Sequence, residues 1–167
     1  MTVQPYDPVW PARFEDERRL LQPVLDEFVT GGIHHVGSTS VPGLDAKPVI
    51  DILAGIAELA SARPCIDLLV PFGYLYAPYR TDEMLWFCKP DPARRTHHLH
   101  LVPAGSARYR DELLFRDYLR EHPDARADYA RLKHALAVRH RQDREAYTEG
   151  KTAFVQKILR QASGLAG

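Results

Sequence analysis

The segment VGSTSVPGLDAKPVIDILAGI, residues 36–56, constrains the fold more than any other part of the sequence. Its second half, 47–56, has apolar residues at both alternating positions, which predicts a strand buried on both faces. Asp51 lies in the middle of that strand. A carboxylate among apolar residues costs several kcal/mol unless it is paired or binds a metal. The sequence therefore predicts that Asp51 belongs to a site, with a structural salt bridge or a capping bond to a loop as the alternatives.

A loop of four small residues precedes this strand and follows a short predicted strand, 33–36. Its members are Gly37, Ser38, Thr39 and Ser40. Backbone N–H groups and hydroxyls in such a loop can surround an anion. The GxxxxGK[ST] and GxGxxG patterns of the common phosphate loops are absent. From spacing alone, a polar turn between two strands is the competing interpretation.

The segment THHLHLV places two histidines on one face of another predicted strand, 96–102. Side chains alternate along a strand, so His98 and His100 point to one side. Two imidazoles at this spacing can chelate a metal, and Asp51 on a neighbouring strand would complete a set of three ligands. One histidine acting as a general base or binding phosphate is the alternative, as is a purely structural role.

Three cations are candidates for binding an anionic ligand. Lys47 precedes the strand of Asp51 and can pair with a phosphate, although a structural lysine at a strand start fits equally well. Arg116, in FRDYLREHP, can pair with Asp117 or reach a ligand. Lys151 begins the last predicted helix, where a cation opposes the helix dipole, and this mismatch indicates an anionic partner.

The order of predicted elements indicates one α+β domain over residues 1–167, with a mostly β middle and a helical C-terminal part. A first helix, 12–29, is expected to kink or divide at Pro23 and to end at Gly31-Gly32. The remaining expected helices are 63–70, 108–121, 124–141 and 148–162, with Asp124 and Thr148 as start signals, and the remaining strands are 74–77 and 84–89.

Composition excludes several classes of function. Lys and Arg together equal Asp and Glu at 22 each, so no global positive field favours nucleic acid or an acidic membrane. No stretch is long enough to span a bilayer, and the N-terminus lacks a signal-peptide pattern, which predicts a cytoplasmic protein. The two cysteines, Cys65 and Cys88, are expected to be reduced core residues. Nothing in the sequence sets the oligomeric state or the partner proteins.

The sequence resembles the GrpB family, also known as UPF0157, over nearly its whole length. The motifs that carry the resemblance are HHVGSTSVPGLDAKPVIDIL, THHLHLVPAGS, LLFRDYLREHP, ARADYARLKHAL and YTEGKTAFVQKIL. The resemblance implies a DNA polymerase β-like nucleotidyltransferase fold, a mixed sheet flanked by helices. In that superfamily a Gly-Ser loop, matched by Gly37 and Ser38, holds the nucleoside triphosphate. The next strand supplies two acidic metal ligands, of which Asp51 matches the first.

The sequence departs from that superfamily at the second acid, because position 53 is Leu53. A two-metal mechanism needs carboxylates that hold both ions. The histidines suit Zn²⁺, Mn²⁺ or Fe²⁺ better than Mg²⁺. Some GrpB-type domains are fused to dephospho-CoA kinase, which implies an accessory role, and this chain has no kinase half.

Three functions follow from these residues. The first is a nucleotidyltransferase-like enzyme that acts at phosphate on a small molecule with a divalent metal. The second is a histidine-metal enzyme with different chemistry on the same fold, and the third is a non-catalytic module that binds a nucleotide or anionic metabolite. In the first, Asp51, His98 and His100 hold the metal or transfer protons, and the loop, Lys47, Arg116 and Lys151 bind the substrate.

Overall fold

The protein's structure, a computed structural model, describes residues 2–164 and has a mixed five-stranded sheet flanked by helices. The strand order is β1-β2-β5-β4-β3, in which β2 and β5 run parallel and the other neighbours run antiparallel. The strands are β1 (Val29–Val36), β2 (Ile50–Ile56), β3 (Leu75–Tyr76), β4 (Leu85–Pro90) and β5 (Arg95–Pro103). The predicted α+β class is confirmed.

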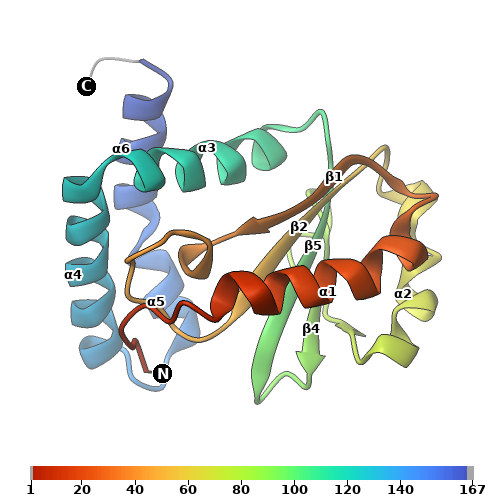
Figure 1. The fold of residues 1–167 in the computed structure, drawn as a ribbon, viewed down its shortest axis with the longest axis horizontal. Coiled ribbons are helices and arrows are strands. Elements are labelled where there is room, and N and C mark those ends of the chain that lie inside the picture. The colour runs from red at the N-terminus through yellow and green to blue at the C-terminus, as the bar shows by residue number, and fades with distance from the viewer. Residues whose placement is uncertain (1, 165–167) are drawn as a thin grey trace.

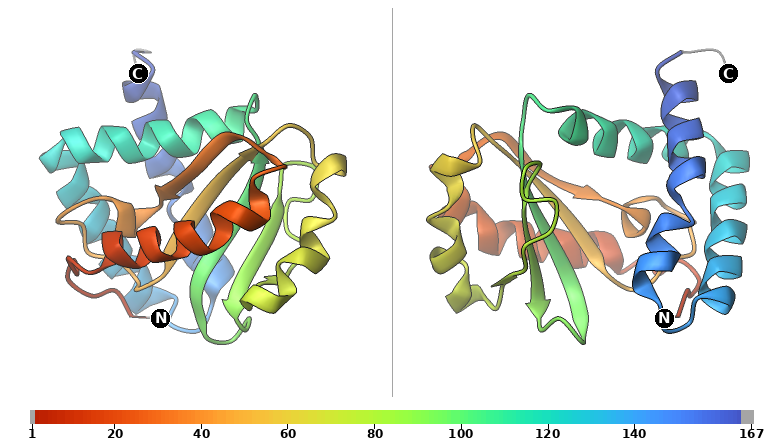
Figure 2. Two further views of the ribbon diagram at one scale, coloured as in Figure 1. Left: turned by 45° about the vertical axis from the view of Figure 1, so that its right-hand side comes forward. Right: turned by 180° about the vertical axis from the view of Figure 1, so that it is seen from behind.

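Helix α1 lies in front of the sheet, whereas α4, α5 and α6 stand together beside it (Figures 1 and 2). The helices are α1 (Trp10–Leu25), α2 (Cys65–Leu68), α3 (Ala107–Glu121), α4 (Pro123–Arg139), α5 (Arg144–Glu149) and α6 (Thr152–Ala162). Short 3₁₀ turns cover Ser38–Ser40, Ala60–Ala62 and Val70–Phe72. The polar loop of the sequence prediction is thus a 3₁₀ turn between β1 and the segment that leads to β2.

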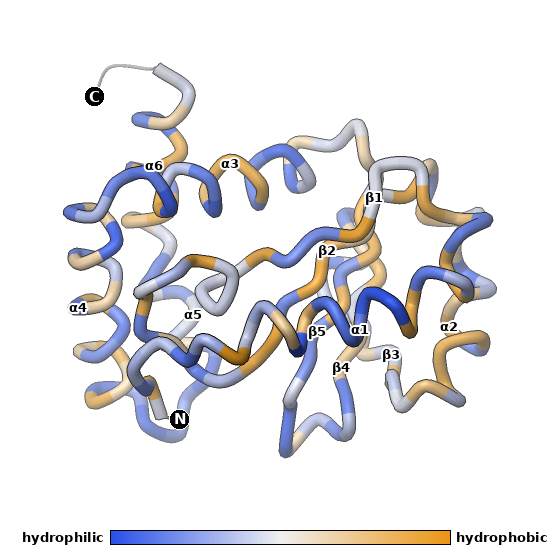
Figure 3. Tube along the Cα trace, in the orientation of Figure 1, coloured by the Kyte–Doolittle hydropathy of each residue, from blue (hydrophilic) through white to orange (hydrophobic). Residues whose placement is uncertain are grey.

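Two apolar layers fix the two faces of the sheet. Hydrophobic and hydrophilic residues alternate along α1 (Figure 3), and its buried residues Trp10, Leu21 and Leu25 pack on one face. The same layer contains residues of β2 and β5, namely Ile50, Ile52, Ala54, Ile56, Leu99 and Leu101. Because side chains alternate, Asp51, His98 and His100 lie on the other face. That face is the one packed by Tyr109 and Leu113 of α3.

The first helix and first strand differ from the sequence prediction. Helix α1 is a single helix that ends at Leu25, with Pro23 inside its last turn, so the predicted division is wrong. Pro23 removes one hydrogen bond of the helix, and the buried residues Leu21 and Leu25 on either side of it keep the helix continuous. Gly31-Gly32 does not end the helix but lies within β1. A Cβ on Gly31 would lie 2.9 Å from the Tyr109 hydroxyl oxygen, so this glycine admits the α3 side chain.

The strand of Asp51 and two of the predicted helices are shorter than expected. Strand β2 begins at Ile50 rather than at Lys47. Only 65–68 of the predicted 63–70 helix is α-helical. The predicted 148–162 helix is two helices, because Asp143 caps α5 and α6 begins after Lys151. Thr148 lies inside α5, so it is not the start signal that the sequence indicated.

Both cysteines of the chain lie in the protein interior. Cys65 and Cys88 are buried and free, as predicted, and burial raises the pKa of the Cys65 thiol to about 11. Within residues 2–164, no helix combines the length and apolar character that a membrane crossing requires.

Buried His35 makes the stability of this fold depend on pH. Its ring stacks on Phe14 at 4.8 Å between centroids, and its Nε2 lies 2.9 Å from the Thr39 hydroxyl. Burial lowers the pKa of His35 to about 4, against the opposing effect of Asp51. The unfolded chain therefore takes up a proton near pH 6.5, before the folded protein does, and stability falls as the pH drops from there towards 4.

We expect His35→Gln to remove part of that pH dependence. The wild type should lose up to roughly 3 kcal/mol of unfolding free energy through this residue between pH 6.5 and 4. Urea unfolding at several pH values measures the slope, and His122→Gln, at an exposed position, is the control. Identical slopes for the wild type and His35→Gln would contradict the prediction.

Candidate metal and anion site

Gly37 lets the loop after β1 pass directly against Asp51. Its φ is +71°, a conformation that favours glycine. A Cβ at this position would lie 2.5 Å from Oδ2 of Asp51 and 3.0 Å from the Asp51 Cβ. Positive φ and close approach thus both require glycine here, and the loop covers one side of the carboxylate.

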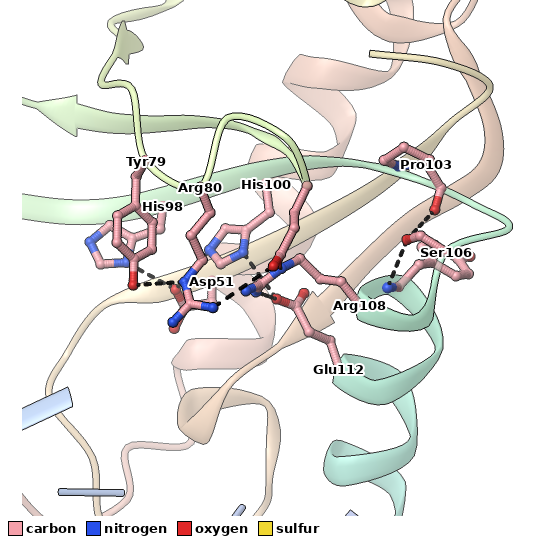
Figure 4. Close-up of polar contacts among 11 residues, drawn as sticks. Asp51, Tyr79, Arg80, His98, His100, Pro103, Ser106, Arg108 and Glu112 are labelled. Carbon is pink, nitrogen blue, oxygen red and sulfur yellow. Dashed lines mark hydrogen bonds and ion pairs between the residues drawn. The ribbon is translucent and has the colours of Figure 1, made fainter. Parts of the chain in front are cut away.

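The sheet brings Asp51 and the two histidines together as the sequence predicted. The parallel register pairs Asp51 with His98 and Leu53 with His100. His98 Nδ1 lies 3.0 Å from Asp51 Oδ1, and His100 Nε2 lies 3.7 Å from the same oxygen. One potential ligand atom from each of the three side chains lies within 4.8 Å of the others (Figure 4). The three residues form a two-histidine, one-carboxylate set that we call the triad.

The triad contains two buried nitrogens without hydrogen-bond partners among the described residues. They are Nε2 of His98 and Nε2 of His100. The 3.7 Å from His100 Nε2 to Asp51 is too long for a hydrogen bond. An unpaired buried polar atom costs about 1 to 3 kcal/mol, and native proteins rarely leave one without a reason. Two such atoms, on adjacent imidazoles beside a carboxylate, fit the requirements of a metal site.

Glu112 of α3 completes the surroundings of His100, and sequence reasoning missed it. Its Oε1 lies 3.3 Å from His100 Nδ1 and accepts a hydrogen bond of 3.2 Å from Arg108. Arg108 also pairs with Glu83. In sequence, Arg108 and Glu112 resemble an ordinary surface pair at i,i+4, so no local signal marked either residue. A carboxylate on one ring nitrogen is the arrangement that orients a metal-binding histidine through its other nitrogen.

The electrostatics of the site favour a cation between the carboxylates of Asp51 and Glu112. Burial lowers the pKa of His100, but Glu112 and Asp51 outweigh it and raise the value to about 10. Burial raises the pKa of Asp51, yet the nearby imidazoles of His100 and His98 bring it well below its usual range. Without a metal, a proton on His100 supplies the positive charge. A metal can take that role by displacing the proton.

The hydroxyls of the loop do not all face the triad. Thr39 donates to the Val49 carbonyl at 3.1 Å, and Ser40 donates to the Gly37 carbonyl at 2.5 Å. Both residues are buried. Ser38 instead contacts the hydroxyl of Tyr129, where it lowers a tyrosine pKa that burial raises. Of the three hydroxyls proposed from sequence, those of Thr39 and Ser40 hold the turn, and contact of Ser38 with a ligand stays a prediction.

Lys47 and Lys151, predicted to bind an anion, meet at one aromatic ring. Their Nζ atoms lie 3.7 Å and 4.7 Å from the centroid of Tyr147. Burial, then Lys151 and Arg144, lower the pKa of Lys47 to about 8. Burial also lowers the pKa of Lys151, and Asp51 opposes that shift.

Lys133 of α4 joins these two lysines and was not found from the sequence. It is only 2% exposed, donates to the Asp45 carbonyl, and lies 4.8 Å from the Tyr129 ring. Burial, then Lys151, lower its pKa to about 7, and Lys47 adds to the effect. In the segment ARLKHAL, Lys133 occupies a position at which a helix usually buries an apolar residue. A charged residue at such a position was the signal that sequence reasoning overlooked. We call Lys47, Lys133 and Lys151 the lysine cluster.

Two arginines of α3 hold the backbone around the loop. Arg116 donates to the His35 carbonyl at 3.1 Å and pairs with Asp117 at 2.8 Å. Arg120 donates to the Ser40 carbonyl at 3.0 Å. These contacts give Arg116 a structural role, and its contact with a ligand stays a prediction.

Leu53 occupies the place of the missing acid. It lies on the same face of β2 as Asp51, is fully buried, and packs in the layer that includes Val36 and Trp86. No carboxylate therefore reaches the triad from β2 beyond Asp51. The second carboxylate near the site comes from α3, as Glu112.

A profile of the GrpB protein family matches residues 1–161, so the chain belongs to the GrpB family. It is 45% identical over 166 residues to UPF0157 protein PA4798 of Pseudomonas aeruginosa, covering 96% of this chain and 66% of that protein. It is 32% identical over 151 residues to UPF0157 protein YqkA of Bacillus subtilis, covering 90% of this chain and 44% of that protein. The chain thus spans less than two thirds of the length of these two relatives.

The crystal structure of the conserved protein GrpB from Enterococcus faecalis has the same fold. Its TM-score to this chain is 0.87 at 34% identity, with 96% of both chains covered. This agreement confirms the α+β mixed sheet, and the family is consistent with the nucleotidyltransferase superfamily. A more distant relative, from Mycolicibacterium paratuberculosis, is named dephospho-CoA kinase; it is 30% identical, and 45% of its length is covered.

We expect Gly37→Ala to disturb Asp51 and to destabilise the protein by roughly 2 kcal/mol, because an L residue is strained at positive φ and its Cβ meets the carboxylate. Gly105→Ala is the matched control, since no atom lies within 4 Å of a Cβ there. Chemical unfolding compares the two variants. Equal stabilities would show that the loop does not press on Asp51.

Proposed function

We propose that this protein is a divalent-metal enzyme that acts at a phosphate group of a small molecule, with nucleotidyl transfer as the class of reaction. The observation that carries the proposal is the pair of unpaired Nε2 atoms of His98 and His100 beside Asp51, with the lysine cluster close by. A metal-binding triad next to a cluster of lysines fits a substrate whose phosphate groups bind both a metal ion and cationic side chains.

The triad would hold one metal ion. Two imidazole nitrogens and one carboxylate oxygen suit Zn²⁺, Mn²⁺ or Fe²⁺ better than Mg²⁺, which prefers oxygen ligands. Glu112 would keep His100 in the tautomer that leaves Nε2 available. A bound metal would polarise a phosphoryl oxygen and offset charge in the transition state.

The lysine cluster would hold the phosphates. Lys133 and Lys151 make no ion pair with a carboxylate among residues 2–164, although they are close enough to Asp51 for it to raise their pKa values. Burying like charges together is costly, and an anionic ligand removes that cost. In nucleotidyl transfer an acceptor oxygen bonds to the α-phosphorus while the bond to the departing pyrophosphate breaks. The cluster would stabilise the negative charge that grows on that leaving group.

A second function, a non-catalytic module that binds a nucleotide or anionic metabolite, is favoured by Leu53. Without a second acid on β2, the two-metal arrangement of the superfamily lacks its bridging ligand. The lysine cluster alone would still bind an anion. The two functions differ in whether ligand binding depends on metal.

We expect purified protein to contain Zn, Mn or Fe at close to one ion per chain, and His98→Ala/His100→Ala to lose it, since two of the three ligands are removed. Elemental analysis measures the content, and exposed His122→Ala is the control. Metal content that is the same in the double variant would exclude the triad as the site.

We expect Lys133→Met to weaken ATP binding by roughly tenfold or more while raising the melting temperature, because the change removes a buried charge. Titration calorimetry and thermal unfolding measure the two effects, with and without a chelator. Lys157→Gln, exposed on α6, is the control. A destabilised variant with unchanged ATP affinity would make Lys133 a structural residue, and binding that ignores the chelator would favour the non-catalytic module.

A further inference from the structure

Two arginines that none of the roles given above uses meet at the loop between β4 and β5. They are Arg95, the first residue of β5, and Arg144, the first residue of α5. Arg95 Nε and Arg144 Nη1 both donate to the Pro92 carbonyl, each at 2.9 Å, and Arg144 Nη2 donates to the Ala93 carbonyl at 3.2 Å. Two guanidinium groups that share one carbonyl oxygen lie side by side. We call Arg95 and Arg144 the arginine pair.

The arginine pair keeps its positive charge without a carboxylate partner. Neither arginine forms an ion pair with a carboxylate among residues 2–164. Burial, and then the charge of Arg144, lower the pKa of Arg95. Two acids of the same region are engaged elsewhere, since Asp91 accepts from two backbone N–H groups of the β4–β5 loop and Asp143 caps α5. Like charges held together without a counter-charge favour an anionic ligand.

The terminal nitrogens of Arg95 are available to such a ligand. Its Nε is the atom that contacts Pro92, whereas Nη1 and Nη2 make no hydrogen bond within the described part of the chain and are not closed to solvent. The guanidinium lies over the ring of Trp86, 5.1 Å from its centroid, and that ring lies 4.9 Å from the ring of His98. A guanidinium stacked on a ring keeps its edge for bidentate contact with phosphate, and here one ring separates it from the triad.

Lys47 connects the arginine pair to the lysine cluster. After burial, Lys151 and Arg144 lower the pKa of Lys47, and Arg95 adds to the effect, so Lys47 lies near both groups of cations. Arg144 is exposed, whereas Lys133 is only 2% exposed. The cations therefore extend from the surface at α5 to the buried lysine cluster.

We infer that the arginine pair is a second anion subsite, which binds the terminal phosphate of a triphosphate chain whose inner phosphates lie at the lysine cluster. Selection of a triphosphate substrate over a monophosphate or diphosphate through this subsite rests on the proposed function, whereas binding of the chain does not. A ligand with one phosphate occupies one subsite only, so affinity rises with the number of linked phosphates.

Inorganic phosphate, pyrophosphate and tripolyphosphate are the probes, because they present the chain without a sugar or base. Titration calorimetry on protein from which metal has been removed measures their affinities. We expect phosphate to bind at about 1 mM and tripolyphosphate about a hundredfold more tightly, with pyrophosphate between them. Equal affinities for phosphate and tripolyphosphate, or no binding of tripolyphosphate, would overturn the inference.

Arg95→Gln/Arg144→Gln removes the arginine pair. We expect its tripolyphosphate affinity to fall about thirtyfold and its phosphate affinity to change less than about twofold, because phosphate binds at the lysine cluster. Arg94→Gln/Arg110→Gln is the control, since it also removes two exposed charges, one of them from the same loop. A loss of equal size for both probes, or an equal loss of tripolyphosphate affinity in the control, would overturn the inference.

Arg95→Lys/Arg144→Lys separates contact with the ligand from loss of the loop structure. Both charges remain and both side chains can still donate to the loop, but neither can hold a phosphate in the bidentate manner. We expect an unchanged melting temperature and a tripolyphosphate affinity about fivefold below that of the wild type. An affinity equal to that of the wild type would count against the subsite.

Metal content and ATP affinity, measured on the same samples, separate this inference from the proposed function. Tripolyphosphate binding that depends on the arginine pair, in a protein without metal, would retain the subsite and remove the enzyme. Metal and ATP binding that ignore the arginine pair would leave the enzyme and remove the subsite.

Discussion

The partly buried carboxylate of Asp51 is the constraint on which the rest of this site depends. It lies in a strand whose other face packs on α1, and its own side chain is 26% exposed on the face that α3 packs. Its charge is instead balanced by His98 and His100 from the parallel neighbour β5, and the loop at Gly37 presses against it. The parallel pairing of β2 and β5, the glycine and the histidines thus all surround one partly desolvated charge.

Helix α3 connects this charge to the rest of the molecule. Glu112 of α3 contacts His100. Further along the helix, Arg116 and Arg120 donate hydrogen bonds to backbone carbonyls of β1 and of the loop. Its apolar residues meanwhile cover the face of the sheet that carries the triad. A helix that both packs the sheet and orients its functional side chains makes the site geometry part of the fold.

The sequence predicted the candidate site better than it predicted the boundaries of the elements. Asp51, His98 and His100 were expected to converge because period-two alternation fixes which side chains share a face. Lys47 and Lys151 were proposed from their local surroundings, and they do meet at Tyr147. Glu112 and Lys133 were missed because one resembled a surface ion pair and the other a helix core position. The division of α1 at Pro23 and the single helix 148–162 were wrong, since packing keeps α1 whole and the cap at Asp143 starts a separate helix α5 that ends before Lys151.

By itself, the sequence determined the α+β class, the small-residue loop before a buried strand, and the residues that share the functional face, because these depend on local periodicity and on the cost of burying a charge. Only the tertiary structure decided which helices complete the site. The positions of Glu112 beside His100 and of Lys133 beside Lys151 depend on how α3, α4 and α6 pack. Contacts between segments far apart in the chain follow from the packing of whole faces, which no local pattern records.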